Sequence, residues 1–173
     1  MEDGMDKEKW FGDRGFDFAQ FCLNGHLVNS ASTIHPQLNQ NFCHKCGAKT
    51  ITTCQRCNNP IKGDDRNVAK HVPGNNTLEI PLFCMDCGAP FPWTESKLGA
   101  ARELVYEVGG LTDQEKEIFY KSIEDIAQET PRIHVAVVRF QKYIAKTGAV
   151  IGGAIRDIVV DIASETAKKL LGI

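Results

Sequence analysis

Residues 43–57 read CHKCGAKTITTCQRC and contain two Cys-x-x-Cys pairs. A third such pair follows later in the chain, and the one remaining cysteine is separated from a histidine by three residues. Two tetrahedral zinc sites need eight ligands, and these four short pairs provide eight. The sequence therefore predicts two structural Zn²⁺ ions. The predicted ligands are Cys22, His26, Cys43, Cys46, Cys54, Cys57, Cys84 and Cys87.

Each short pair is expected to form a tight turn, called a knuckle below, that presents two ligand atoms to one ion. The residue after the second cysteine of such a turn often takes a left-handed conformation, which suits glycine or asparagine. Gly47, Asn58 and Gly88 occupy this position. Gly25 lies inside the remaining knuckle, where it would let His26 turn toward the metal of Cys22.

Four knuckles can be combined into two sites in three ways. We favour joining the first knuckle to the second, and the third to the fourth, because the connecting segments 27–42 and 58–83 are long enough for a hairpin. Joining the second to the third leaves only residues 47–53 between them, and the last arrangement needs interleaved sites. The favoured pairing predicts two successive zinc ribbons, and the other two stay open.

His26 is the one predicted ligand that is not a cysteine, and a lone histidine is more often solvated than bound to metal. It is predicted to bind because the first site otherwise lacks a fourth ligand. Zinc is the expected ion for sulfur-rich tetrahedral sites. Iron is the alternative, because sulfur ligation does not exclude it.

The composition changes near Trp93. All seven cysteines and six of the seven prolines lie within residues 16–93, whereas residues 94–173 show helical periodicity. We expect a mobile tail at 1–12, a tandem zinc-ribbon module of short β hairpins at 13–93, and an all-α bundle of four helices at 94–173. The expected class is α+β. The aromatic segment 90–93 is predicted to seal the ribbon against the helices and cover a small core, and an aromatic recognition surface is the alternative.

Helix signals divide the C-terminal half. Gly109-Gly110 is expected to end the first helix, Thr112 and Glu115 form a capping box for the second, and Gly148 separates the third from the last. The last helix is expected to be continuous, with an apolar stripe from Ile151 to Leu170. The expected N-terminal caps are Thr94, Thr112 and Thr130.

Two helices carry apolar side chains beyond their main stripes. These include Val135 and Val138 on the third helix, and Val150 and Ala154 on the last. Two interpretations are equally open. Either a helix is buried in the centre of the bundle, or a face is left for self-association or a partner protein.

The chain has 20 basic and 22 acidic side chains, and thiolate ligands would make it more negative. This disfavours a general polyanion binder. The polar N-terminus has no apolar signal segment, and the charge-free stretch 147–155 is too short to cross a bilayer. With paired, reduced cysteines, these features predict a cytoplasmic protein.

The residues around the knuckles resemble an uncharacterised family of bacterial proteins that has a domain of unknown function built on zinc ribbons. The resemblance implies a bacterial, cytoplasmic, zinc-binding protein and implies no activity. It also extends to the helical C-terminal part. The matching segments are 22–26, 42–50, 54–57 with 60–63, and 83–88 with 92–94.

No phosphate-cradling loop, nucleophile elbow or Rossmann turn occurs. We therefore expect a non-enzymatic scaffold or adaptor that binds a protein or itself through the C-terminal helices. A zinc hydrolase is conceivable only if His26 leaves the first site open, with Asp17 as the nearest candidate base. The other alternative is a nucleic-acid-binding regulator. Its candidate cations are Lys45, Lys49, Arg56, Lys62, Arg66 and Lys70.

Overall fold

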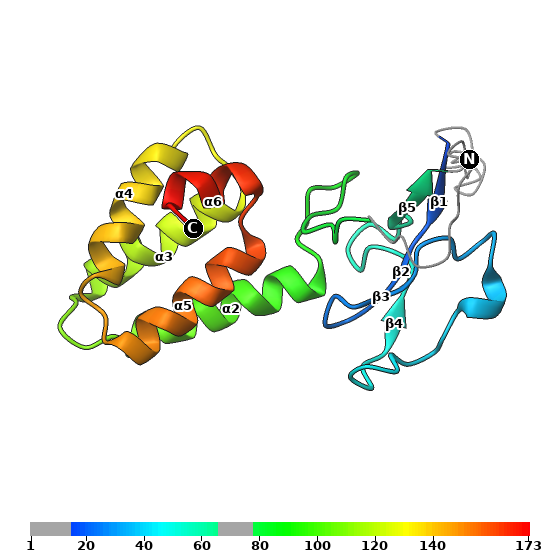
Figure 1. Cartoon of the computed structure of the whole chain (residues 1–173), viewed down its shortest axis with the longest axis horizontal. Helices are drawn as coiled ribbons and strands as arrows, with labels where there is room; N and C mark the ends of the chain where they lie inside the picture. Colours follow the sequence, from blue (N-terminus) through cyan, green and yellow to red (C-terminus); the bar gives the residue numbers. More distant parts are fainter. Residues whose placement is uncertain (1–14, 66–77) are drawn as a thin grey trace, which may run out of the picture. The chain divides into compact units, whose positions relative to one another are not determined.

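The computed structural model describes residues 15–65 and 78–173, and the expected tail at 1–12 lies outside them (Figure 1). The chain divides into two compact units, Met1–Thr94 and Glu95–Ile173. Short antiparallel strands occupy the first unit and helices follow, so the α+β prediction is confirmed. Across the described ranges, no helix combines the length and apolar character needed to cross a membrane.

The described part of the first unit contains two small antiparallel sheets. One pairs β1 with β5, and the other places β2 between β3 and β4. The strands are only two to four residues long, because knuckles and turns interrupt the chain. The elements are β1 (Phe16–Phe18), β2 (Gln20–Cys22), β3 (Leu27–Asn29), the 3₁₀ helix η1 (Pro36–Leu38), β4 (Thr50–Ile51) and β5 (Lys62–Asp65).

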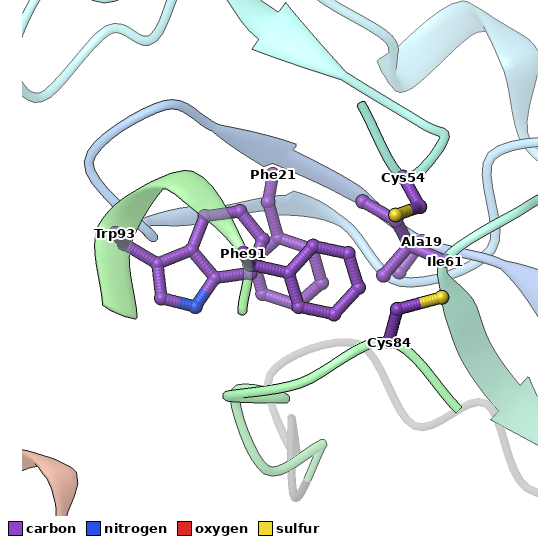
Figure 2. Close-up of a cluster of buried hydrophobic side chains, with 7 residues drawn as sticks. All are labelled: Ala19, Phe21, Cys54, Ile61, Cys84, Phe91 and Trp93. Atoms are coloured by element: carbon purple, nitrogen blue, oxygen red, sulfur yellow. The ribbon is translucent and has the colours of Figure 1, made fainter. Parts of the chain in front are cut away.

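Three aromatic rings form much of the core of the first unit. The Trp93 ring stacks on Phe91 at 4.8 Å between centroids and lies 5.2 Å from Phe21. The Trp93 Nε1–H donates to the carbonyl of Pro81 at 2.8 Å. In Figure 2 the rings lie together on one side, with Ala19, Ile61 and two cysteines on the other. Phe91 and Trp93 thus cover the small ribbon core, as expected for the rings of this segment.

The second unit contains most of the helical residues. Helices α3 and α4 pack along each other, α5 packs against α3, and α6 packs against α4. Phe119 on α3 contacts the rings of Phe140 and Tyr143 on α4, with centroids 5.7 and 5.6 Å apart. The helices are α2 (Pro92–Glu107), which begins in the first unit, α3 (Asp113–Ala127), α4 (Ile133–Ile144), α5 (Ala149–Ile162) and α6 (Glu165–Leu171).

The expectation of four helices is wrong, because the last expected helix is two helices. Helix α5 ends at Ile162, and Ala163 is extended at φ −87° and ψ 143°. The Ser164 hydroxyl accepts from the Ala167 amide at 3.1 Å and begins α6. A serine oxygen competes for backbone amides in this way, so it favours a new N-cap over helix continuation. The break also changes the phase, so that Leu171 is buried in place of Leu170.

Of the other expected helix starts, one agrees with the structure and two differ from it. The Thr112–Glu115 capping box is present as expected. Helix α2 begins at Pro92 and not after Thr94, because proline suits the first helical turn and the Thr94 hydroxyl donates to the Leu82 carbonyl at 2.8 Å. Helix α4 begins at Ile133, later than expected, although the Thr130 hydroxyl accepts from the Arg132 amide at 3.3 Å while it donates to Asp125 at 3.0 Å.

Candidate metal centre

The three Cys-x-x-Cys knuckles have the same backbone hydrogen bonds. In each, the first cysteine N–H donates at 2.8 Å to the carbonyl five residues later, and the amide four residues on donates back at 2.7–2.9 Å. The residue making the second bond has a positive φ: 72° at Gly47, 62° at Asn58 and 69° at Gly88. The left-handed conformations expected at these positions are confirmed. Each knuckle is closed by an antiparallel bridge, Phe42 with Lys49, Thr53 with Pro60, and Phe83 with Pro90.

The first knuckle connects β2 to β3 and differs from the other three. Cys22 and His26 form its ends, with the Cys22 amide donating to the His26 carbonyl at 3.0 Å. The His26 amide donates to the Cys22 sulfur at 3.3 Å. Gly25 has φ +82°, and a Cβ on it would lie 2.9 Å from Trp93 Cγ. Only glycine fits this turn without strain, and its close approach to Trp93 ties the knuckle to the core.

The structure brings the eight predicted ligands together in two groups, in the arrangement that the loop lengths favoured. Within each group, all four ligand atoms lie within 4.8 Å of one another, so each group could hold a metal ion. The first cluster is Cys22, His26, Cys43 and Cys46. The second cluster is Cys54, Cys57, Cys84 and Cys87.

The distances fit tetrahedral coordination. In the first cluster, Nδ1 of His26 lies 3.5 Å from the Cys22 sulfur and 3.7 Å from the Cys43 sulfur. In the second cluster, the sulfurs of Cys54 and Cys87 are 3.8 Å apart, and those of Cys57 and Cys84 are 3.7 Å apart. Four sulfurs about 2.3 Å from a central ion would be separated by about 3.8 Å. Both donor sets therefore have the spacing of a tetrahedral metal site.

The thiols of the second cluster differ in how readily they ionise, and burial raises the pKa of both Cys57 and Cys84. Burial opposes ionisation of Cys54, but the amides of Cys57 and Arg56 outweigh it and lower its pKa to about 7. Burial raises the pKa of Cys84 to about 12, and the neighbouring thiols of Cys57 and Cys54 add to the rise. Thiolates at this spacing repel one another, so ionisation of one thiol disfavours ionisation of its neighbours. A dication among the sulfurs removes that conflict and stabilises all four thiolates.

Each cluster offers four protein ligands, which would leave a tetrahedral ion without an open position. Asp17, the candidate base, is fully buried and accepts from the Ile34 amide at 3.0 Å and from the Thr33 hydroxyl. Its carboxylate organises the loop after β3 and is occupied by these donors. Both observations count against the hydrolase hypothesis.

Sequence reasoning did not single out Asn24. Its side-chain amide donates to the Cys46 sulfur at 3.4 Å, across the first cluster. Amide donors to ligand sulfurs stabilise the thiolate and orient it. The available signal was its place between Cys22 and His26, where an exposed amide lies next to two ligands.

The comparisons with known proteins agree with the resemblance noted from the knuckle residues. No curated protein and no solved structure matches the chain. A sequence model of the family described as "Uncharacterized protein conserved in bacteria (DUF2321)" matches residues 15–171, which is most of the chain. The chain belongs to this uncharacterised bacterial family.

Proposed function

We propose that the chain is a zinc-stabilised, non-enzymatic adaptor. Zinc ions in both clusters hold the first unit in its fold, and α4 of the second unit binds a partner protein. The observation that carries the proposal is the pair of exposed valines on α4, with 47% of Val135 and 65% of Val138 accessible to solvent. Thiolate ligands persist in a reducing compartment, so the cytoplasm is the proposed place of action.

Zinc is the proposed ion because both donor sets are closed, rich in sulfur and tetrahedral in spacing. A structural role follows from the position of the ligands. Cys54 and Cys84 belong to the hydrophobic core of the first unit together with Phe91 and Trp93. An ion on these sulfurs would tie together segments that are far apart in sequence.

The α4 face consists of the exposed side chains His134, Val135, Val138, Gln141 and Lys142. These positions follow a helical spacing of three and four residues, so they lie on one side of the helix. The opposite side packs inward through Ala136, Val137, Phe140 and Tyr143. Exposed valines at successive turns are the pattern by which a helix meets a partner.

Charge suggests the chemistry of the partner. Residues 130–156 contain five lysines and arginines and no aspartate or glutamate. Arg132 and Lys142 are exposed along α4. A partner with carboxylates around an apolar centre would complement this face, whereas symmetric pairing of two α4 faces would bring like charges together. We therefore place a different protein here, and not a second copy of the chain.

The test compares wild type with Val138→Asp, using Val150→Asp as the matched control because Val150 is also an exposed valine of the second unit. Native mass spectrometry should find two zinc ions in all three proteins, and iron in either cluster would contradict the zinc assignment. Immobilised wild type and Val150→Asp should retain the same acidic partner from a bacterial lysate, and Val138→Asp should lose it.

Two outcomes would overturn the adaptor proposal. One is retention of the partner by Val138→Asp. The other is a concentration-dependent dimer of the wild type, seen by light scattering, that Val138→Asp abolishes. That result would assign the α4 face to self-association.

A further inference from the structure

The knuckle that contains Cys43 and Cys46 leaves an aromatic ring in solvent. Phe42 precedes its first cysteine, and 64% of this residue is exposed. Phe83 occupies the same position in the last knuckle, with the same backbone hydrogen bonds, and is half-buried. The exposure of Phe42 therefore does not follow from the knuckle conformation, and its ring adds little to the core.

A lysine is the cross-strand partner of Phe42. Phe42 and Lys49 are opposed across an antiparallel bridge. The hydrogen bonds lie on either side of the pair, from Cys43 N to Ala48 O at 2.8 Å and from Thr50 N to Asn41 O at 3.2 Å. The two residues thus form a non-hydrogen-bonded pair, in which the Cα atoms approach to about 4.5 Å and the side chains share one face. Both side chains are exposed.

The surrounding sequence is free of carboxylates. Residues 18–63 contain four cations, Lys45, Lys49, Arg56 and Lys62, and no aspartate or glutamate. Lys45 is exposed and lies between the two cysteines of the same knuckle. Zinc ions in the first and second clusters, with their ligands, would carry one and two net negative charges, which offset most of this excess and leave the positive charge local to Lys45 and Lys49. The remaining positive charge suits a few phosphate contacts and not tight binding to any polyanion.

We infer that the Phe42 surface, defined as Phe42, Lys45 and Lys49, binds single-stranded nucleic acid. One unpaired base stacks on the Phe42 ring, and the flanking phosphates lie near the ammonium groups of Lys49 and Lys45. Aromatic stacking beside cations is how sequence-tolerant single-strand binders work, because every base has a flat face. A duplex keeps its bases stacked on one another, so the ring favours unpaired strands. This inference concerns the first unit and is independent of the proposed α4 partner.

The test is fluorescence anisotropy of labelled oligothymidine and oligouridine, each of about 12 nucleotides, titrated with the metal-loaded full chain. We expect saturable binding at about 50 mM NaCl. Two phosphate contacts predict a slope of about −1.4 for log affinity against log salt, so binding should weaken about sevenfold at about 200 mM. The two oligonucleotides separate a DNA ligand from an RNA ligand.

Three variants locate the site, and each is first shown by native mass spectrometry to keep its metal. Phe42→Ala should weaken binding by about 5- to 150-fold, which corresponds to the loss of about 1–3 kcal/mol from one stacked base. Phe42→Tyr should restore it. Lys49→Gln should lower the magnitude of the salt slope by about 0.7. Met85→Ala is the matched control, since Met85 is 52% exposed in another knuckle, and it should bind like wild type.

Any of three results would overturn the inference. The first is no anisotropy change at about 200 µM protein and about 50 mM NaCl. The second is equal loss of affinity in Phe42→Ala and Met85→Ala. The third is equal binding of a duplex of the same length, which would indicate general attraction to phosphate in place of base stacking.

Discussion

The two units of this chain are stabilised in different ways. Among the described residues of the first unit, seven form a buried hydrophobic cluster, and two of these are cysteines of the second candidate metal cluster. In the second unit, helices bury a continuous set of aliphatic and aromatic side chains, among them Phe119, Ile123, Ile155 and Ile162. A small core offsets little of the entropy of ordering its loops, so we expect the first unit to depend on metal cross-links and the second to fold without them.

Metal removal should produce the largest difference in stability between the two units. Structural zinc in small domains contributes an apparent binding free energy of about 10–16 kcal/mol, much of which is folding free energy. A strong chelator should therefore unfold the first unit and leave the second helical. Hydrogen exchange with mass spectrometry should show fast exchange in segments from 15–65 and continued protection within 113–162. Equal loss of protection in both units would contradict the comparison.

Cys54→Ser tests the same dependence at one cluster. The variant should lose the ion of the second cluster and keep that of the first, as measured by native mass spectrometry. Two tightly held ions in this variant would show that Cys54 is not a ligand.

The next largest effect is expected at the glycines of the knuckles. In Gly25→Ala, the alanine would adopt a positive φ and its Cβ would lie 2.9 Å from the Trp93 side chain. In Gly47→Ala, the alanine would adopt a positive φ of 72°, but no atom lies within 4 Å of its Cβ. The left-handed conformation costs about 1–2 kcal/mol, and overpacking adds about 1–3 kcal/mol. Gly25→Ala should thus destabilise the first unit more than Gly47→Ala does.

The two alanine variants are compared by the guanidinium concentration at which a chromophoric chelator captures half of the metal. Gly25→Ala should release its metal at the lower concentration. Equal guanidinium midpoints for the two variants would show that the Trp93 side chain moves aside without a cost in free energy. Protection of α3 should be unchanged in both variants, because the second unit does not depend on these turns.

The smallest effect concerns one carboxylate of the second unit. The Thr112 amide and the Lys146 ammonium hold the pKa of Glu115 at about 2, below its ordinary value of 4.5. A lowered folded-state pKa means that Glu115 contributes stability above about pH 4.5, and that this contribution is lost as pH falls toward about 2. Thermal unfolding of wild type and Glu115→Gln, followed by circular dichroism, should therefore differ at pH 6 and converge across that window.

Acid also releases metal from thiolate ligands, but it does so in both proteins and cancels in their difference. Glu103→Gln, a change at an exposed glutamate of α2, is the control. A difference between wild type and Glu115→Gln that stays constant down to pH 2 would contradict the assigned role of Glu115.

Local features of this protein could be predicted well from its sequence. The left-handed residues of the knuckles, the capping box at Thr112 and the aromatic seal at Trp93 all follow from short-range chemistry or from a few large side chains. The eight candidate ligands were identifiable for the same reason, because each pair is held by the geometry of one turn. Fold class followed from the change in composition between the two halves.

Where the local sequence allows a residue two structural roles, the tertiary structure decides between them. Ser164 begins a new helix where a continuous one was expected, and Thr94 serves the core where it was expected to cap. Phe42 and Phe83 occupy equivalent positions in equivalent knuckles, yet Phe42 is exposed and Phe83 is half-buried. Burial depends on neighbours brought together by the whole fold, and no local pattern contains that information. The sequence by itself thus determined the candidate donor atoms and the turns that present them, while packing determined which surfaces remain exposed.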